Sequence, residues 1–131
     1  MAIPQNVKPA SIGLRLSAYG ERDLLTVADR VQLLVNAISD ETDFPPVVKL
    51  FTPDANATWL ISEVDPDDPD RLFGLCDLGL GYPELGYVSL AEIGAVKGPL
   101  GLPVERDLHF VADKPLSAYV DEARSTGRVL T

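Results

Sequence analysis

Three side chains able to bind a metal or transfer a proton lie two residues apart near the C-terminal end of the sequence: Glu105, Asp107 and His109. In a strand, residues two apart point to the same face. Carboxylate and imidazole groups bind divalent cations, and a bound cation activates water for hydrolysis. If Val104–Val111 is a strand, these residues are candidate catalytic residues. We favour a simpler interpretation, a polar face exposed to solvent, because the sequence lacks a second histidine for a typical zinc site.

Arg106 lies on the other, apolar side of the same predicted strand. A guanidinium group on a buried face needs a carboxylate or several carbonyl oxygens as partners. We therefore expect a structural ion pair with Glu84, Glu92 or Asp77. The alternative is that Arg106 binds an anionic partner.

Four carboxylates gather in residues 65–70, together with two prolines that are excluded from the interior of a sheet. We expect this segment to be an acidic loop at one end of the sheet. It resembles a calcium-binding loop but lacks the central glycine and the final bidentate glutamate. A solvated turn or a negative patch facing a basic partner is the better interpretation. The candidate binding residues are therefore Asp65, Asp67, Asp68, Asp70 and Arg106.

Cys76 and His109 contain the groups of a nucleophile and its base, but Cys76 lies in an apolar run, where a cysteine is usually inert packing. A single cysteine also excludes an internal disulfide and fits a reducing, cytoplasmic compartment. The sequence contains neither a phosphate- or dinucleotide-binding glycine pattern nor a Gly-x-Ser-x-Gly motif. We therefore expect no cofactor.

The composition limits the class of partner. The 131 residues are 46% hydrophobic, which is enough for one domain with one core. Twenty acidic and eleven basic residues give a net charge of −9, so unaided nucleic-acid binding is not expected, and a charged partner should be basic. No apolar run approaches the length needed to span a membrane.

Two helices are predicted from apolar residues at helical spacing. The first begins after Thr26, a candidate N-cap with Asp29 three residues later. Its expected buried face consists of Val27, Val31, Leu34, Val35 and Ile38. The last helix follows Pro115, with Ser117 as the expected cap and Gly127 as the end. Its expected apolar face consists of Leu116, Tyr119, Val120 and Ala123.

The segments between these helices predict strands and one further short helix. Ser89 and Glu92 have the spacing of a capping box, which predicts a helix running toward Val96. The expected extended segments are Val47–Phe51, Ala57–Val64, Arg71–Leu78, Leu85–Val88 and Val104–Val111. Runs of strands separate from helices predict an α+β fold, a small and mainly antiparallel meander packed with about three helices. We expect an N-terminal extension over residues 1–22, with a short edge strand through Ile12, Leu14 and Leu16, and a single domain over residues 23–131.

Several separated motifs together carry a family resemblance. They are Phe51–Ala55, Thr58–Trp59, Phe73–Leu75, Glu84–Leu90 and the ordered loop and strand of Gly98–Asp107. From Leu24 to the final helix the chain resembles the bacterial domain-of-unknown-function family 2958. The resemblance implies no established activity. It does imply an association with plasmids, integrative elements and phage-like elements, sometimes beside anti-restriction-type domains.

These observations lead to an expected function of the binding class. We expect a small acidic, non-enzymatic protein-binding or accessory module of a mobile element, acting against host defence by presenting carboxylates where DNA phosphates would lie. The expected partner is a basic or nucleic-acid-handling protein, with no direct nucleic-acid or membrane contact. The alternative is a metal-assisted hydrolase that uses Glu105, Asp107 and His109. A third class, a structural accessory module, would form a stable homo-oligomer; the sequence leaves the oligomeric state open.

Overall fold

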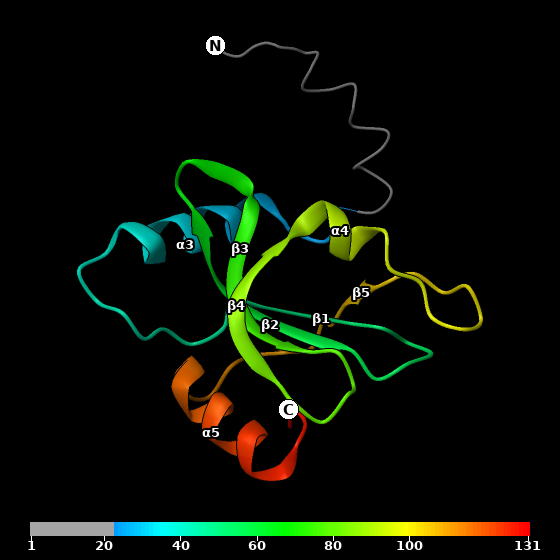
Figure 1. Cartoon of the computed structure of the whole chain (residues 1–131). Coiled ribbons are helices and arrows are strands. Elements are labelled where there is room, and N and C mark those ends of the chain that lie inside the picture. Colours follow the sequence, from blue (N-terminus) through cyan, green and yellow to red (C-terminus); the bar gives the residue numbers. More distant parts are fainter. Residues whose placement is uncertain (1–22) are drawn as a thin grey trace, which may run out of the picture.

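The computed structural model describes residues 23–131, which form three helices and one five-stranded antiparallel sheet (Figure 1). The predicted α+β class is confirmed. The N-terminal extension and the short edge strand expected within it lie outside the described residues. Within residues 23–131, no helix combines the length and apolarity needed to cross a membrane.

The sheet is a four-stranded meander with one added edge strand. Its strands are β1 (Val48–Phe51), β2 (Thr58–Asp65), β3 (Asp68–Asp77), β4 (Glu84–Ser89) and β5 (Glu105–Arg106). The spatial order is β4-β3-β2-β1-β5, so the last strand in the chain pairs with the first. This long-range pairing places Arg106 opposite Leu50 of β1.

Helices cover both faces of the sheet (Figure 1). Helices α3 (Val27–Ile38) and α4 (Leu90–Gly94) lie on one face, and α5 (Leu116–Thr126) lies on the other. The predicted N-cap Thr26 of α3 is confirmed, because its hydroxyl accepts from the Asp29 backbone N–H; the Asp29 carboxylate also accepts from the Thr26 backbone N–H, which completes a capping box. The N-cap of α5 is Pro115 rather than Ser117.

The cap of α5 was predicted wrongly because a tertiary contact occupies Ser117. Its backbone N–H and its hydroxyl donate to the two carboxylate oxygens of Asp43, at 3.1 and 2.5 Å. The C-terminal end was predicted correctly: Gly127 closes the helix with a φ of 83°, in the left-handed region that favours glycine.

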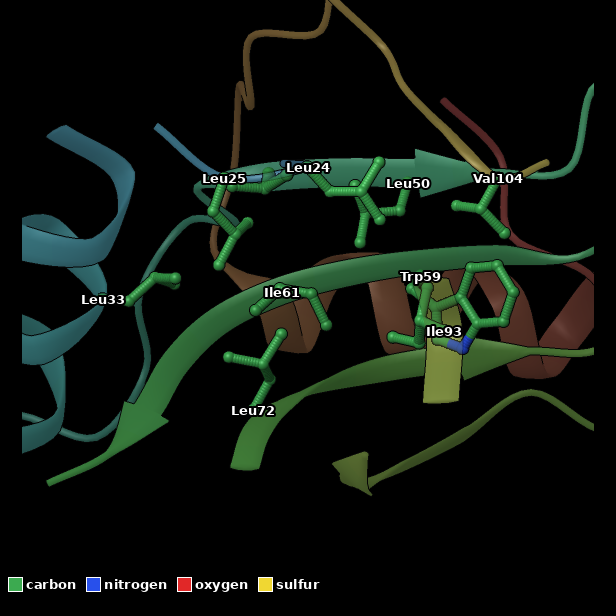
Figure 2. Close-up of a cluster of buried hydrophobic side chains, with 10 residues drawn as sticks. Leu24, Leu25, Leu33, Leu50, Trp59, Ile61, Leu72, Ile93 and Val104 are labelled. Carbon is green, nitrogen blue, oxygen red and sulfur yellow. The ribbon is translucent and has the colours of Figure 1, made fainter. Parts of the chain in front are cut away.

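Two hydrophobic clusters fill the space between the sheet and its helices, one on each face. The larger cluster packs α3 and α4 onto the sheet and includes Leu33, Trp59, Ile61 and Ile93 (Figure 2). In Figure 2, Leu33 is the residue that α3 directs toward the strands. The second cluster is formed under α5 by Leu60, Leu75, Leu116, Tyr119, Val120 and Ala123. The predicted buried face of α5 is therefore confirmed.

A bulge in β2 shapes the surface against which α3 packs. Ile61 pairs with Gly74 and Glu63 pairs with Phe73, so Ser62 is an extra residue in its strand. The side-chain amide of Asn36 in α3 donates to the Ser62 carbonyl at 2.9 Å. This hydrogen bond pairs two buried polar groups across the helix–sheet interface, where an unpaired carbonyl would be costly.

The loop before β5 is ordered, as its glycines and prolines predict. The Leu100 backbone N–H donates to Asp54 Oδ2 at 2.6 Å, which fixes the loop to the turn between β1 and β2. A Cβ atom at Gly98 would lie 1.8 Å from Asp54 Oδ1, so a side chain there would displace the carboxylate that holds the Leu100 N–H. The loop thus positions the short strand that carries Arg106.

Candidate protein-binding surface

Arg106 forms a structural ion pair, as predicted, but with a different partner. Its guanidinium group binds both carboxylate oxygens of Asp29 in α3, with Nη2 3.1 Å from Oδ1, and Nη1 also donates to the Leu24 carbonyl at 3.1 Å. The prediction of Glu84, Glu92 or Asp77 is wrong because these residues lie in β4, α4 and β3, and β2 and β1 separate β5 from β3 and β4 in the sheet. These contacts occupy the guanidinium group, which leaves Arg106 less suited to binding an external anion.

The same contacts set the charge state of Asp29. Burial by itself raises the pKa of this carboxyl group, but hydrogen bonds from Arg106 and Thr26 outweigh that effect and lower the pKa below its ordinary value. Asp29 is therefore a buried, ionised group. Its partners are Thr26, the N-cap of its own helix, and Arg106, 77 residues later in the chain.

Glu105, Asp107 and His109 do not share a strand face. The predicted strand Val104–Val111 is too long, because β5 contains only Glu105 and Arg106 and the chain turns from Asp107 onward. The His109 backbone N–H donates to Asp107 Oδ1 at 2.9 Å, and this bond, with the Lys49 ammonium 3.4 Å from Oδ2, holds the pKa of Asp107 below its ordinary value. Across residues 23–131, no three His, Cys, Asp or Glu side chains converge in a geometry that holds a metal ion.

Asp107 and His109 line a shallow, polar cavity of about 460 Å³ between the β5 side of the sheet and the C-terminal segment. The two lysines that line it are already paired, Lys49 with Asp107 and Lys114 with Glu122 at 3.0 Å. Lys114 also lies over the Tyr119 ring, 4.3 Å from its centroid. Both ammonium groups of the cavity are therefore already paired with carboxylates rather than free for an anionic ligand.

Cys76 behaves as the sequence predicts. The side chain is half-buried in β3, and burial, together with the nearby Glu84 carboxylate, raises the pKa of its thiol to about 11. The thiol is thus neutral near pH 7 and a poor nucleophile.

Residues 65–70 form a hairpin turn within the sheet rather than a loop outside it. β2 continues to Asp65 and β3 begins at Asp68, and these two residues pair with each other. Pro69 is tolerated because a register shift leaves it outside the β2–β3 pairs, and β3 begins to pair with β4 only at Arg71.

The four acidic candidates of this hairpin divide into two kinds. Asp65 pairs with Arg71 at 3.0 Å, and Asp70 accepts hydrogen bonds from Ser89 and from the backbone N–H of Ala91 at the start of α4. These two carboxylates support the fold. Asp67 and Asp68 are exposed at the turn and form the hairpin tip, the part of this segment that is open to a partner.

The most distinctive surface of the described residues is on α3. Its buried residues are Asp29, Leu33 and Asn36, and five of its other aliphatic residues face outward with exposed fractions between 41% and 77%. We name this surface the α3 stripe; it consists of Val27, Val31, Leu34, Val35 and Ile38. The prediction that these five residues form the buried face is wrong.

Two signals in the sequence point to the true orientation. Asp29, Leu33 and Asn36 are four and three residues apart, so they share a second helical face that carries one large apolar residue between two hydrogen-bonding groups. Arg106 in an apolar environment requires a carboxylate, and Asp29 meets that need. When the helix is considered alone, however, five aliphatic residues on one face predict burial of that face more strongly than either signal predicts burial of the other.

The family model described as a protein of unknown function, DUF2958, matches residues 24–130. The chain belongs to the DUF2958 family. No curated protein and no solved structure matches it.

The DUF2958 match contains every surface described above, from the α3 stripe to the cavity beside the C-terminal segment. The family description names no activity. The function of this DUF2958 domain must therefore be inferred from its own side chains, and the stripe places five exposed aliphatic residues on one helix.

Proposed function

We propose that this DUF2958 domain is a non-enzymatic protein-binding module and that the α3 stripe is a surface it buries against another protein chain. The observation that carries the proposal is the exposure of all five aliphatic residues of the stripe on one helix. Removing apolar surface from water is favourable by about 25 cal/mol per Å². A contiguous apolar patch of this kind marks an interaction surface more often than scattered exposed residues do.

The contacts of the candidate catalytic residues also favour a binding role. Asp107 pairs with Lys49 and accepts from a turn N–H, and Glu105 is exposed in a two-residue strand. His109 lies in the turn after that strand rather than on its face. We therefore propose no hydrolase activity at this position.

We further propose that one partner is a basic, nucleic-acid-handling protein, and that the domain serves a mobile element against host defence in the cytoplasm. The net charge of −9 and the exposed carboxylates of Asp67 and Asp68 support a basic partner. Exposed carboxylates can compete with phosphates for a basic cleft. Binding of that kind should weaken as salt rises.

The test is a pull-down from host lysate with the tagged chain at low and moderate salt, followed by mass spectrometry. The baits are the native chain, Leu34→Glu and the matched control Leu108→Glu, which places the same charge on a leucine that is 80% exposed outside the stripe. We expect a partner that the native chain and Leu108→Glu retain and Leu34→Glu loses. Identical retention by all three baits would contradict a binding role for the stripe. A basic partner that Asp67→Asn plus Asp68→Asn also loses would connect the hairpin tip to the same complex.

A further inference from the structure

The two edges of the sheet differ in their protection against pairing with another chain. Strand β5 forms one edge with only two residues, both charged, Glu105 and Arg106. Strand β4 forms the other edge and pairs with β3 through six consecutive residue pairs without a register shift. Charged side chains, proline, bulges and short length are the usual protections of an edge strand. Over residues 85–89, β4 has no charged residue, no proline and no bulge.

The outer side of β4 is open among the described residues 23–131. Figure 1 shows β4 as the last strand on its side of the sheet. Apart from the pairs with β3, no backbone hydrogen bond joins residues 84–88 to another described segment. In an antiparallel pair, alternate residues direct both their N–H and C=O groups away from the partner strand. The outer side of β4 therefore presents a row of backbone donors and acceptors that an extended chain satisfies.

One face of β4 carries apolar side chains up to this open edge. Leu85 lies opposite Leu75 of β3 and is 40% exposed. Tyr87 lies opposite Phe73 and is 54% exposed. The Tyr87 ring is held in place, because the Phe73 ring centroid lies 5.2 Å from its own and the guanidinium carbon of Arg71 lies 3.8 Å from it. A fixed, half-exposed aromatic side chain binds a partner at a small cost in side-chain entropy.

Carboxylates lie beyond both ends of this apolar surface. Glu84 is exposed at the start of β4. At the other end Ser89 pairs with Arg71, and β3 extends beyond this pair to the acidic hairpin tip. The Arg71 guanidinium over Tyr87 is itself paired with Asp65 at 3.0 Å. The charges therefore favour a strand with basic residues at its ends, and they disfavour a second copy of this acidic chain.

From these observations we infer that the free edge of β4 binds an extended segment of a partner protein as a sixth strand of the sheet. The segment has apolar residues at every second position, facing Leu85 and Tyr87, and lysine or arginine at its ends. Backbone hydrogen bonds supply affinity, and the alternate side chains supply specificity. The six residues of β4 span about 20 Å, so the interface is smaller than a standard one and the complex is readily reversible.

The β4 edge is a different surface from the α3 stripe. Leu85 and Tyr87 continue the face of the sheet that α5 covers, whereas α3 lies on the other face. The two surfaces can therefore be tested separately, and either proposal can fail without the other.

Selection from a phage library of random peptides of about twelve residues tests the inference. The baits are the full native chain, Leu85→Lys on the open edge, Leu34→Glu in the α3 stripe and the matched control Leu108→Lys, which lies after β5 at the opposite edge. We expect enriched peptides with the alternating, basic-ended pattern. They should bind Leu85→Lys at least about tenfold more weakly than the native chain and bind the other two variants like the native chain. Circular dichroism verifies the fold of each variant.

Three results of the selection would overturn the inference. One is that no such peptide is enriched. Another is that the peptides bind the native chain and Leu85→Lys equally, or that a scrambled peptide of the same composition binds as well, which would show charge attraction alone. The third is that the peptides lose binding to Leu34→Glu instead, which would assign them to the α3 stripe and support the proposed function.

Amide hydrogen exchange measured by NMR tests the strand pairing on the native full chain and needs no variant. In the free chain, we expect every second amide of β4 to exchange rapidly, and saturation with a selected peptide to slow these amides at least about tenfold. Unchanged exchange in β4 would overturn the inference, because the peptide would then bind without pairing. Protection of these amides in the free chain would also overturn it, because another segment or a second copy would already occupy the edge.

Discussion

Helices α3 and α5 pack on opposite faces of one sheet, yet they present opposite sides to it. Helix α5 buries Leu116, Tyr119, Val120 and Ala123, the face that its apolar pattern predicts. Helix α3 instead buries the face that carries Asp29 and Asn36 and exposes its aliphatic stripe. Amphipathic spacing therefore shows that a helix has two distinct faces, while the partners available in the fold decide which face is buried.

The partners differ between the two faces of the sheet. Beneath α3, the Arg106 guanidinium and the Ser62 carbonyl each require a polar group, and Asp29 and Asn36 supply them. Beneath α5, the sheet offers apolar side chains such as Leu60 and Leu75. Burying the aliphatic stripe here instead would leave the Arg106 charge and the Ser62 carbonyl without these partners, so the polar contacts favour the observed orientation of α3.

The strongest test of this contrast uses two neighbouring leucines. Leu33→Ala should destabilise the domain by about 2–5 kcal/mol, because Leu33 is fully buried in the larger cluster. Leu34→Ala should change the free energy of unfolding by no more than about 0.5 kcal/mol, because Leu34 is on the exposed stripe. Urea unfolding at about 1 μM measures both. Equal or reversed effects would show that α3 is not oriented as described.

A second test removes the polar contact that orients α3. Arg106→Met leaves the Asp29 carboxylate buried without its partner and should destabilise the domain by about 2–4 kcal/mol. We expect a value toward the lower end of the range for buried pairs, since 24% of the Arg106 side chain remains exposed. The control is Arg30→Met, which breaks a pair with Asp23 whose side chains are both about 40% exposed; it should cost no more than about 1 kcal/mol. Similar losses for the two variants would argue against a structural role for the Arg106 pair.

The smallest expected effect is a change in pH dependence. The pKa of Asp29 is lower in the folded state than its ordinary value, so near that range the unfolded chain binds more protons than the folded chain. The ionised carboxylate therefore contributes stability above its unfolded-state pKa, and this contribution is lost as pH falls from about 5 through the folded-state pKa. Asp29→Asn should lose less stability than the native chain over this interval. Urea unfolding at a series of pH values measures both slopes, and parallel slopes would exclude Asp29 as a contributor.

Much of the fold follows from local patterns. The N-cap at Thr26 was predictable because it depends on Asp29, only three residues later. The helix end at Gly127 and the loop at Gly98 were predictable because glycine adopts backbone angles that other residues avoid and proline fixes φ. The α+β class followed from the order of the strands and helices. Residues 65–70 were predicted as a loop because proline is normally excluded from the interior of a sheet. They form a hairpin turn instead, because a register shift leaves Pro69 outside the β2–β3 pairs.

The candidate sites were harder to predict because they depend on residues distant in the chain. The strand expected to align Glu105, Asp107 and His109 ends after two residues, and its length is limited by its pairing with β1. Alternating residue types in a short segment carry no information about where such a pairing stops.

The sequence by itself determined the family, the fold class, the acidic charge and the two faces of each long helix. Only the tertiary structure decided that Arg106 meets Asp29, 77 residues earlier in the chain, and that α3 turns its aliphatic stripe outward. The physical reason is that helical spacing is a local property, whereas the need to pair a buried charge and a bulge carbonyl arises only once β5 lies beside β1 and α3 lies across β2.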